Sequence, residues 1–145
     1  MISEKSPLLA ATFTWLDGDG WSPEVEAEDG VITVSFRGDN GLWSCVATTV
    51  EDQERVIFYS LYPEMVPEEC RPAVAELFTR VNFGLLIGNF ELDLSDGEAR
   101  YRTSIDVEGA ELTDALLRQI VYANVAAMDH FFPAISAVIA ELAAS

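Results

Sequence analysis

The sequence predicts an α+β domain in which three helices pack against an antiparallel sheet of about six strands. Three observations lead to this class. Stretches of alternating apolar and polar residues predict strands, and stretches with apolar residues at every third or fourth position predict helices. Asp-Gly and Asn-Gly pairs, which favour turns, separate them. The predicted order is α-β-β-β-β-α-β-β-α. Because no linker or internal repeat interrupts it, we expect residues 1–145 to form a single domain.

The first helix is predicted over residues 7–16, with Leu9, Phe13 and Leu16 on one side. It ends at residues 17–20, Asp-Gly-Asp-Gly, which break helices. This tetrapeptide resembles the start of a calcium loop. It lacks the later ligands and the closing Glu, so we interpret it as a turn and not as a metal site.

A hairpin is predicted next, with a two-residue turn at residues 29–30. This turn sets Ala27 opposite Ile32 and Val25 opposite Val34, all on one face.

The third strand is predicted over residues 42–50. Its connection to the second strand is either a tight turn at residues 40–41 or a four-residue loop. Either connection keeps the same side chains on the face of Phe36, namely Trp43, Cys45 and Ala47.

The fourth strand, residues 55–62, is an almost continuous run of β-branched and aromatic residues. Such a run is typical of a central strand covered on both faces, and we predict that here.

The second helix follows Pro67, and Pro72 must lie in its first turn. We expect it to end near residues 82–84, where Asn82 and Gly84 tolerate a left-handed cap. Its apolar residues have helical spacing: Val74, Leu77, Phe78 and Val81.

The last hairpin is predicted around a type I′ turn at Asp96 and Gly97. On the solvent face this register pairs acidic residues with basic ones: Asp93 with Arg100, and Glu91 with Arg102. On the other face it pairs Leu92 with Tyr101, and Phe90 with Thr103.

A long C-terminal helix is predicted to begin after the capping residue Thr113 and to be interrupted or kinked at Pro133. Its apolar arc spans about 200°, roughly twice what one core contact requires. The arc contains Leu116, Leu117, Ile120, Val121, Ala123, Asn124, Val125, Ala127, Met128, Phe131 and Phe132.

The surplus arc needs a second covering surface: a helix of the same chain, a dimer partner or a client protein. We hypothesise that Val121, Val125 and Phe132, at one edge of the arc, face a partner. Asn124, near the middle, is either a hydrogen-bonded core residue or a specificity device at an interface.

Composition excludes several classes of function. The chain is 50% hydrophobic, so it can bury a core, but 25 acidic against 8 basic residues give a net charge of −17. This charge repels phosphate backbones and anionic membranes, so we expect neither nucleic acid nor membrane as a partner. The chain has no signal-peptide pattern and no uncharged span of about 20 apolar residues. With only Cys45 and Cys70, it fits a reducing cytoplasm.

The sequence contains no recognisable catalytic, cofactor or metal motif. His130 is the only histidine and follows Asp129, but adjacent helical residues point about 100° apart and do not pair. The glycines form neither a P-loop nor a dinucleotide fingerprint. The three tryptophans, Trp15, Trp21 and Trp43, are interpreted as packing residues. We therefore expect no enzyme activity, no cofactor and no metal.

Residues 66–133 resemble the YbjN family of small bacterial proteins, which are described as sensory transduction regulators. The resemblance lies in VPEECRPAVAELFTRVN at residues 66–82, IGNFELDLSDGEARYR at residues 87–102, and MDHFFP at residues 128–133. FYSLYP at residues 58–63 is similar to the strand end that precedes the second helix in that family.

The resemblance implies a fold similar to type III secretion chaperones, often dimeric. The family has no agreed catalytic residues. We therefore expect a non-enzymatic regulatory or adaptor domain that acts through protein contacts, possibly as a homodimer. The alternative is a chaperone that holds an extended client segment, and a remote alternative is an uncharacterised enzyme.

Overall fold

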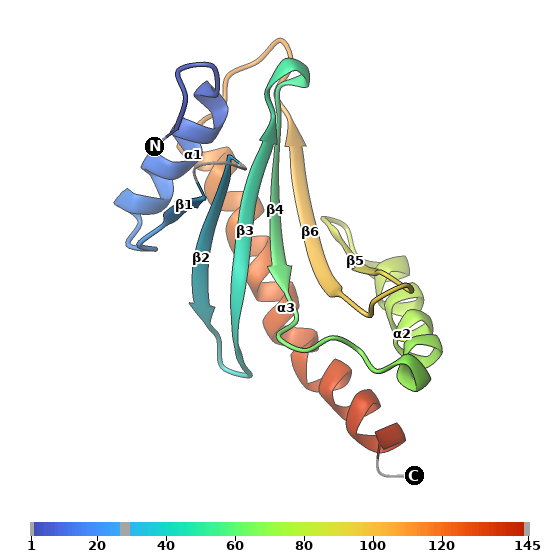
Figure 1. Ribbon diagram of the computed structural model, residues 1–145. Coiled ribbons are helices and arrows are strands. Elements are labelled where there is room, and N and C mark those ends of the chain that lie inside the picture. The colour runs from blue at the N-terminus through green and yellow to red at the C-terminus, as the bar shows by residue number, and fades with distance from the viewer. Residues whose placement is uncertain (1, 27–29, 144–145) are drawn as a thin grey trace.

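In the computed structural model, which describes residues 2–26 and 30–143, the helices cover one face of a six-stranded antiparallel sheet (Figure 1). The elements follow the predicted order, and the fold class is confirmed. They are α1 (Pro7–Gly18), β1 (Glu24–Glu26), β2 (Val31–Arg37), β3 (Leu42–Val50), β4 (Arg55–Leu61), α2 (Arg71–Gly84), β5 (Asn89–Leu92), β6 (Ala99–Asp106) and α3 (Asp114–Ala143).

The strands lie in the order β1-β2-β3-β4-β6-β5, so β4 and β6 are neighbours although α2 and β5 separate them in the chain. Along β4, buried Val56, Phe58 and Ser60 alternate with half-buried residues. The prediction that this strand is covered on both faces is wrong. The helices lie on the face of Phe58 (Figure 1), and on the other face a side chain of the neighbouring strand β6, Arg100, lies 4.2 Å from the centre of the Tyr59 ring.

The predicted faces of the strands are correct, but two registers are wrong by two residues. Val25 lies opposite Ile32 instead of Val34. The predicted partner of Ile32, Ala27, lies outside the described residues. Because a shift of two keeps each side chain on its own face, the core is unaffected.

In the last hairpin, Glu91 lies opposite Arg100 and Phe90 opposite Tyr101. The predicted two-residue turn is replaced by residues 93–98. Asp93 explains the wider connection, because its Oδ1 accepts hydrogen bonds from the backbone N–H and the hydroxyl of Ser95 (2.9 and 2.6 Å). Its carbonyl also accepts the N–H of Gly97 (2.8 Å).

Between β2 and β3, the ladder closes at Arg37 and Leu42, so the connection is the four-residue alternative. Trp43, Cys45 and Ala47 face the core as predicted.

The second helix begins as predicted, with Pro72 in its first turn, and ends at Gly84. Neither Asn82 nor Gly84 adopts the left-handed cap, because Leu85 continues in extended conformation. Asn82 instead pairs with the backbone of Phe90. Its Oδ1 accepts the Phe90 N–H (2.7 Å), and its Nδ2 donates to the Phe90 carbonyl (3.1 Å). The side chain thus occupies the outer edge of β5, which a foreign strand could otherwise use.

The third helix starts at the predicted cap, since the Leu116 N–H bonds to Thr113 Oγ1 (3.2 Å). It continues as one helix through Pro133, so of the two predicted alternatives the interruption is wrong. Proline leaves the carbonyl of Asp129 without its helical donor. Asn40, in the β2–β3 loop, supplies one through Nδ2 (2.9 Å). The Asp129 carboxylate accepts the N–H groups of Asp39 and Asn40 as well (3.1 and 2.8 Å).

By length and composition, α3 could also cross a membrane. It has 30 residues, its most apolar window has a mean hydropathy of 1.4, and 22% of that window is buried. A helix of a protein core meets the same test. Here α3 packs on β4 and β6, and several of its exposed residues are alanines (Ala126, Ala137 and Ala140).

We predict that Asn82→Ala destabilises the fold by about 1–2 kcal/mol, because the Phe90 N–H loses its acceptor at the sheet edge. It should also promote aggregation through the bared edge of β5. Urea unfolding and turbidity on heating measure the two effects. Asn82→Asp keeps an acceptor and should lie closer to wild type; equal losses in both variants would contradict this role.

We also predict that Asn40 and Pro133 are coupled. Asn40→Ala should cost about 0.5–1.5 kcal/mol in the wild type. In the Pro133→Ala background it should cost less, because residue 133 then supplies an N–H to the Asp129 carbonyl. A double-mutant cycle by urea unfolding measures the coupling. A coupling energy of zero would show that this carbonyl does not need Asn40.

Candidate protein-binding surface

The residues predicted to face a partner lie inside the chain. Val121 is 0% exposed and Val125 2% exposed, both against the sheet. Phe132 is half-buried, with its ring centre 5.6 Å from that of Trp43 and 5.0 Å from that of Tyr62. The hypothesis that Val121 and Val125 face a partner is therefore wrong, because the core of the chain buries both side chains and leaves no exposed surface on them.

The same holds for the whole apolar arc of α3, whose residues are all buried or half-buried within the chain. Phe132 also meets the β2–β3 loop so closely that a Cβ on Gly41 would lie 2.7 Å from its ring. The surplus arc is therefore covered by the chain itself, which was one of the three alternatives. Asn124 is the hydrogen-bonded core residue: its Nδ2 donates to the carbonyls of Phe58 and Tyr101 (2.8 and 3.1 Å).

A different set of apolar residues is exposed. In the last turn of α2, Phe83 is 95% exposed, and in the connection from α2 to β5, Leu86 is 99% and Ile87 58% exposed. We call residues 83–87 the apolar turn. Fully burying a side chain of this size contributes about 1.5–3 kcal/mol. Three such side chains close together on the surface therefore indicate a contact site.

The backbone of the apolar turn is held in place from beneath. Leu85 packs on the core, and the Tyr101 hydroxyl donates to the Ile87 carbonyl. Gly88, with a positive φ of +78°, lies so close to β6 that a Cβ there would be 2.6 Å from the Arg102 carbonyl oxygen. The turn therefore presents its exposed side chains from a fixed backbone, which lowers the entropy cost of binding.

The charges near the apolar turn are few and mostly paired. Residues 81–90 contain no charged side chain, although the chain carries 25 acidic residues. Glu91, on β5, bonds to both Arg100 (2.7 Å) and Arg102 (2.8 Å). The turn is therefore a surface that a second acidic molecule can approach.

The structure gives the nucleophilic side chains of the core no access to solvent. Cys45 and Ser60 are both 0% exposed, with Sγ and Oγ 3.6 Å apart. Burial raises the pKa of the Cys45 thiol to about 12, so the thiol stays protonated and unreactive at neutral pH. His130 is exposed at the surface of α3, and the Asp129 carboxylate binds the β2–β3 loop.

Sequence reasoning missed the apolar turn because it treated residues 82–84 as the end of the second helix and assigned residues 85–86 to no element. A signal was present, since FGLLI is apolar although it falls in a predicted connection. Connections lie at the surface, so four large apolar side chains within five residues indicate either a buried turn or a contact site.

Comparison with known proteins finds two similar solved structures. The crystal structure of YbjN from E. coli matches with a TM-score of 0.62 and 18% identity, over 94% of this chain and 91% of that one. The crystal structure of the ExsC–ExsE complex matches with a TM-score of 0.56 and 12% identity, over 90% of this chain and 94% of the matched one. At these identities the likeness shows the fold, which agrees with the chaperone-like α+β arrangement predicted. No curated protein matches the sequence.

The sequence also matches a protein family. The model of YbjN, described as "Putative bacterial sensory transduction regulator", covers residues 13–137. This match spans the second half of α1, the whole sheet and most of α3. The chain therefore belongs to the YbjN family.

Proposed function

We propose that this chain is a cytoplasmic, non-enzymatic regulatory domain that acts through protein–protein contacts, as a homodimer formed at the apolar turn. The observation that carries the proposal is the exposure of Phe83, Leu86 and Ile87 on a backbone held in place by the core. Membership of a family described as regulatory supports the regulatory role.

A second copy fits this surface on electrostatic grounds. Each copy carries a net charge of −17, so two copies repel wherever acidic surfaces meet. The apolar turn brings no carboxylate of its own into the contact. A two-fold axis through the turn would set Phe83 and Leu86 of one copy against the same residues of the other, as isologous interfaces require.

A second candidate function is a chaperone-like domain that holds a client segment. It is favoured by the likeness in fold to the ExsC–ExsE complex. Such a client would not add as a strand along β5 at Phe90, because Asn82 already occupies that edge. It would instead insert apolar side chains at the apolar turn.

The double substitution Phe83→Ser and Leu86→Ser tests the proposal. We expect the wild type to be a dimer in sedimentation equilibrium and the variant to dimerise about 100-fold more weakly or worse, because each copy loses two buried apolar side chains. Both side chains are solvent-exposed within one chain, so the far-UV circular dichroism should not change.

The matched control is Leu42→Ser with Met65→Ser, which also removes two exposed apolar side chains (50% and 60% exposed) away from the turn. This control should dimerise like wild type. A monomeric wild type would refute the homodimer. If the wild type were a monomer that captured a client protein, and if Phe83→Ser with Leu86→Ser abolished this capture while the control did not, the client-holding function would replace the homodimer proposal.

A further inference from the structure

Four aromatic side chains gather near Asp19, and two of them donate hydrogen bonds to its carboxylate. The elements α1 and β2, which carry two of the four, lie at the opposite edge of the sheet from the apolar turn (Figure 1). The four side chains come from α1, the segment after it, β2 and α3: Trp15, Trp21, Phe36 and Tyr122. We call these four residues the aromatic surface. The Tyr122 ring lies 6.3 Å from that of Trp15 and 6.0 Å from that of Trp21, which stacks on Phe36 at 5.5 Å. Tryptophan and tyrosine clusters of this kind are typical of the centres of binding interfaces.

Asp19 is fixed within the aromatic surface as an anion. The Tyr122 hydroxyl (2.6 Å) and the Trp21 indole N–H (3.0 Å) both donate to its Oδ2. These two hydrogen bonds lower the pKa of Asp19 below its usual value. No donor among residues 2–26 and 30–143 bonds to Oδ1, so this oxygen keeps its lone pairs for a ligand.

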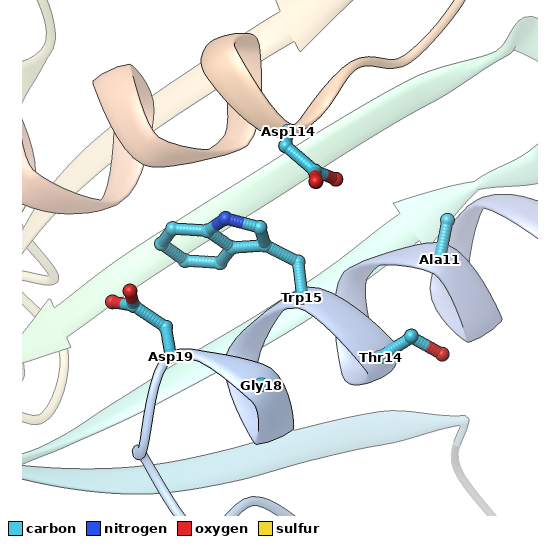
Figure 2. Close-up of a pocket in the computed structure, with 6 residues that line it drawn as sticks. All are labelled: Ala11, Thr14, Trp15, Gly18, Asp19 and Asp114. Atoms are coloured by element: carbon cyan, nitrogen blue, oxygen red, sulfur yellow. The ribbon is translucent and has the colours of Figure 1, made fainter.

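A hollow of about 490 Å³ opens beside this carboxylate, between α1 and the start of α3. Figure 2 shows the indole of Trp15 lying between the carboxylates of Asp19 and Asp114. The remaining lining residues are Ala11, Thr14 and Gly18, so none of the six is basic. A smaller hollow of about 240 Å³ is also lined by Asp19, together with Trp21, Phe36 and Tyr122, and it includes one basic residue, Arg37.

We propose that the aromatic surface binds an arginine side chain of a basic protein segment, with the guanidinium on the Trp15 indole and bonded to Asp19 and Asp114. The inference rests on the proposed function only in that the domain acts through protein contacts. Charge complementarity selects the partner: a chain of net charge −17 attracts a basic segment, and two carboxylates flank the aromatic face.

Arginine fits this hollow better than lysine does. The guanidinium is planar, stacks on an indole, and presents donors toward two carboxylates at once. The ammonium of lysine is a compact, strongly hydrated charge that cannot make both contacts. Arg118 lies close enough to Asp19 to lower the pKa of its carboxyl, but neither Arg118 nor Arg37 lines this hollow.

The test is a titration of the ¹⁵N-labelled chain with an acetylated tetra-arginine peptide, followed by the indole N–H signals in NMR spectra. The Trp15 and Trp21 signals should shift to saturation, whereas that of Trp43, buried in the core, should stay fixed. Tetra-lysine should bind more weakly by about two- to fivefold.

Variants separate a specific site from general attraction. Asp114→Asn should weaken tetra-arginine binding by about two- to fivefold, whereas Glu68→Gln, an equal change of charge at an exposed residue outside the hollow, should not. Trp15→Leu should abolish the preference for arginine over lysine, and Arg118→Gln should strengthen binding by removing a like charge.

Equal losses in Asp114→Asn and Glu68→Gln, or equal binding of the two peptides by wild type, would overturn the proposal in favour of non-specific attraction. Absence of any shift would overturn it outright. The Phe83→Ser and Leu86→Ser variant should bind the peptide like wild type. Dimerisation therefore tests the proposal for the apolar turn, and peptide binding tests the proposal for the aromatic surface, so either proposal can fail without the other.

Discussion

The hydrogen bonds of Asn124 are the contact on which the rest of the structure depends. From the middle of α3, its Nδ2 reaches the carbonyls of Phe58 on β4 and Tyr101 on β6, and Thr103 Oγ1 as well. These strands are neighbours only because the chain returns to the sheet after α2 and β5. Asn124 is fully buried, and its Oδ1 has no partner among the described atoms. A buried oxygen without a donor costs about 1–3 kcal/mol, so the two N–H groups of Nδ2, shared among these three acceptors, must offset that cost as well as fix the helix.

The alternation of side chains along a strand explains why the sequence predicts the faces of the strands better than their registers. Side chains alternate with period two, so the buried face of each strand follows from its pattern of apolar and polar residues alone. The registers depend on individual turn contacts, such as those of Asp93 with Ser95, which no alternation reveals. The composition of β4 was misleading for a related reason. Apolar residues on both sides of a strand do not say whether a helix, or only neighbouring side chains such as Arg100, cover the second face.

The candidate surfaces were harder to predict because exposure is a property of the whole fold. The apolar arc of α3 was recognised from its width, but whether Val121 met a partner or the sheet depended on where the helix lay. The aromatic surface was invisible in the sequence, since Tyr122 meets Asp19 from 103 residues away. The sequence predicts the tryptophans to be packing residues, and Trp43 is indeed buried in the core. Trp15 packs on Tyr122 but also lines an open hollow.

The arrangement of the two surfaces has a consequence for how the domain can work. The apolar turn lies at the β5 edge of the sheet, and the aromatic surface lies at the β1–β2 edge, with β3, β4 and β6 between them (Figure 1). A contact at one edge therefore leaves the other open, and a dimer joined at the apolar turn would carry its two aromatic surfaces at its outer ends. Two arginine-bearing segments could then bind one dimer, and a partner with two such segments would bind more tightly than either alone. The acidity of the chain favours this division of roles, because it disfavours association of copies everywhere except at the uncharged turn and attracts basic partners to the remaining surface.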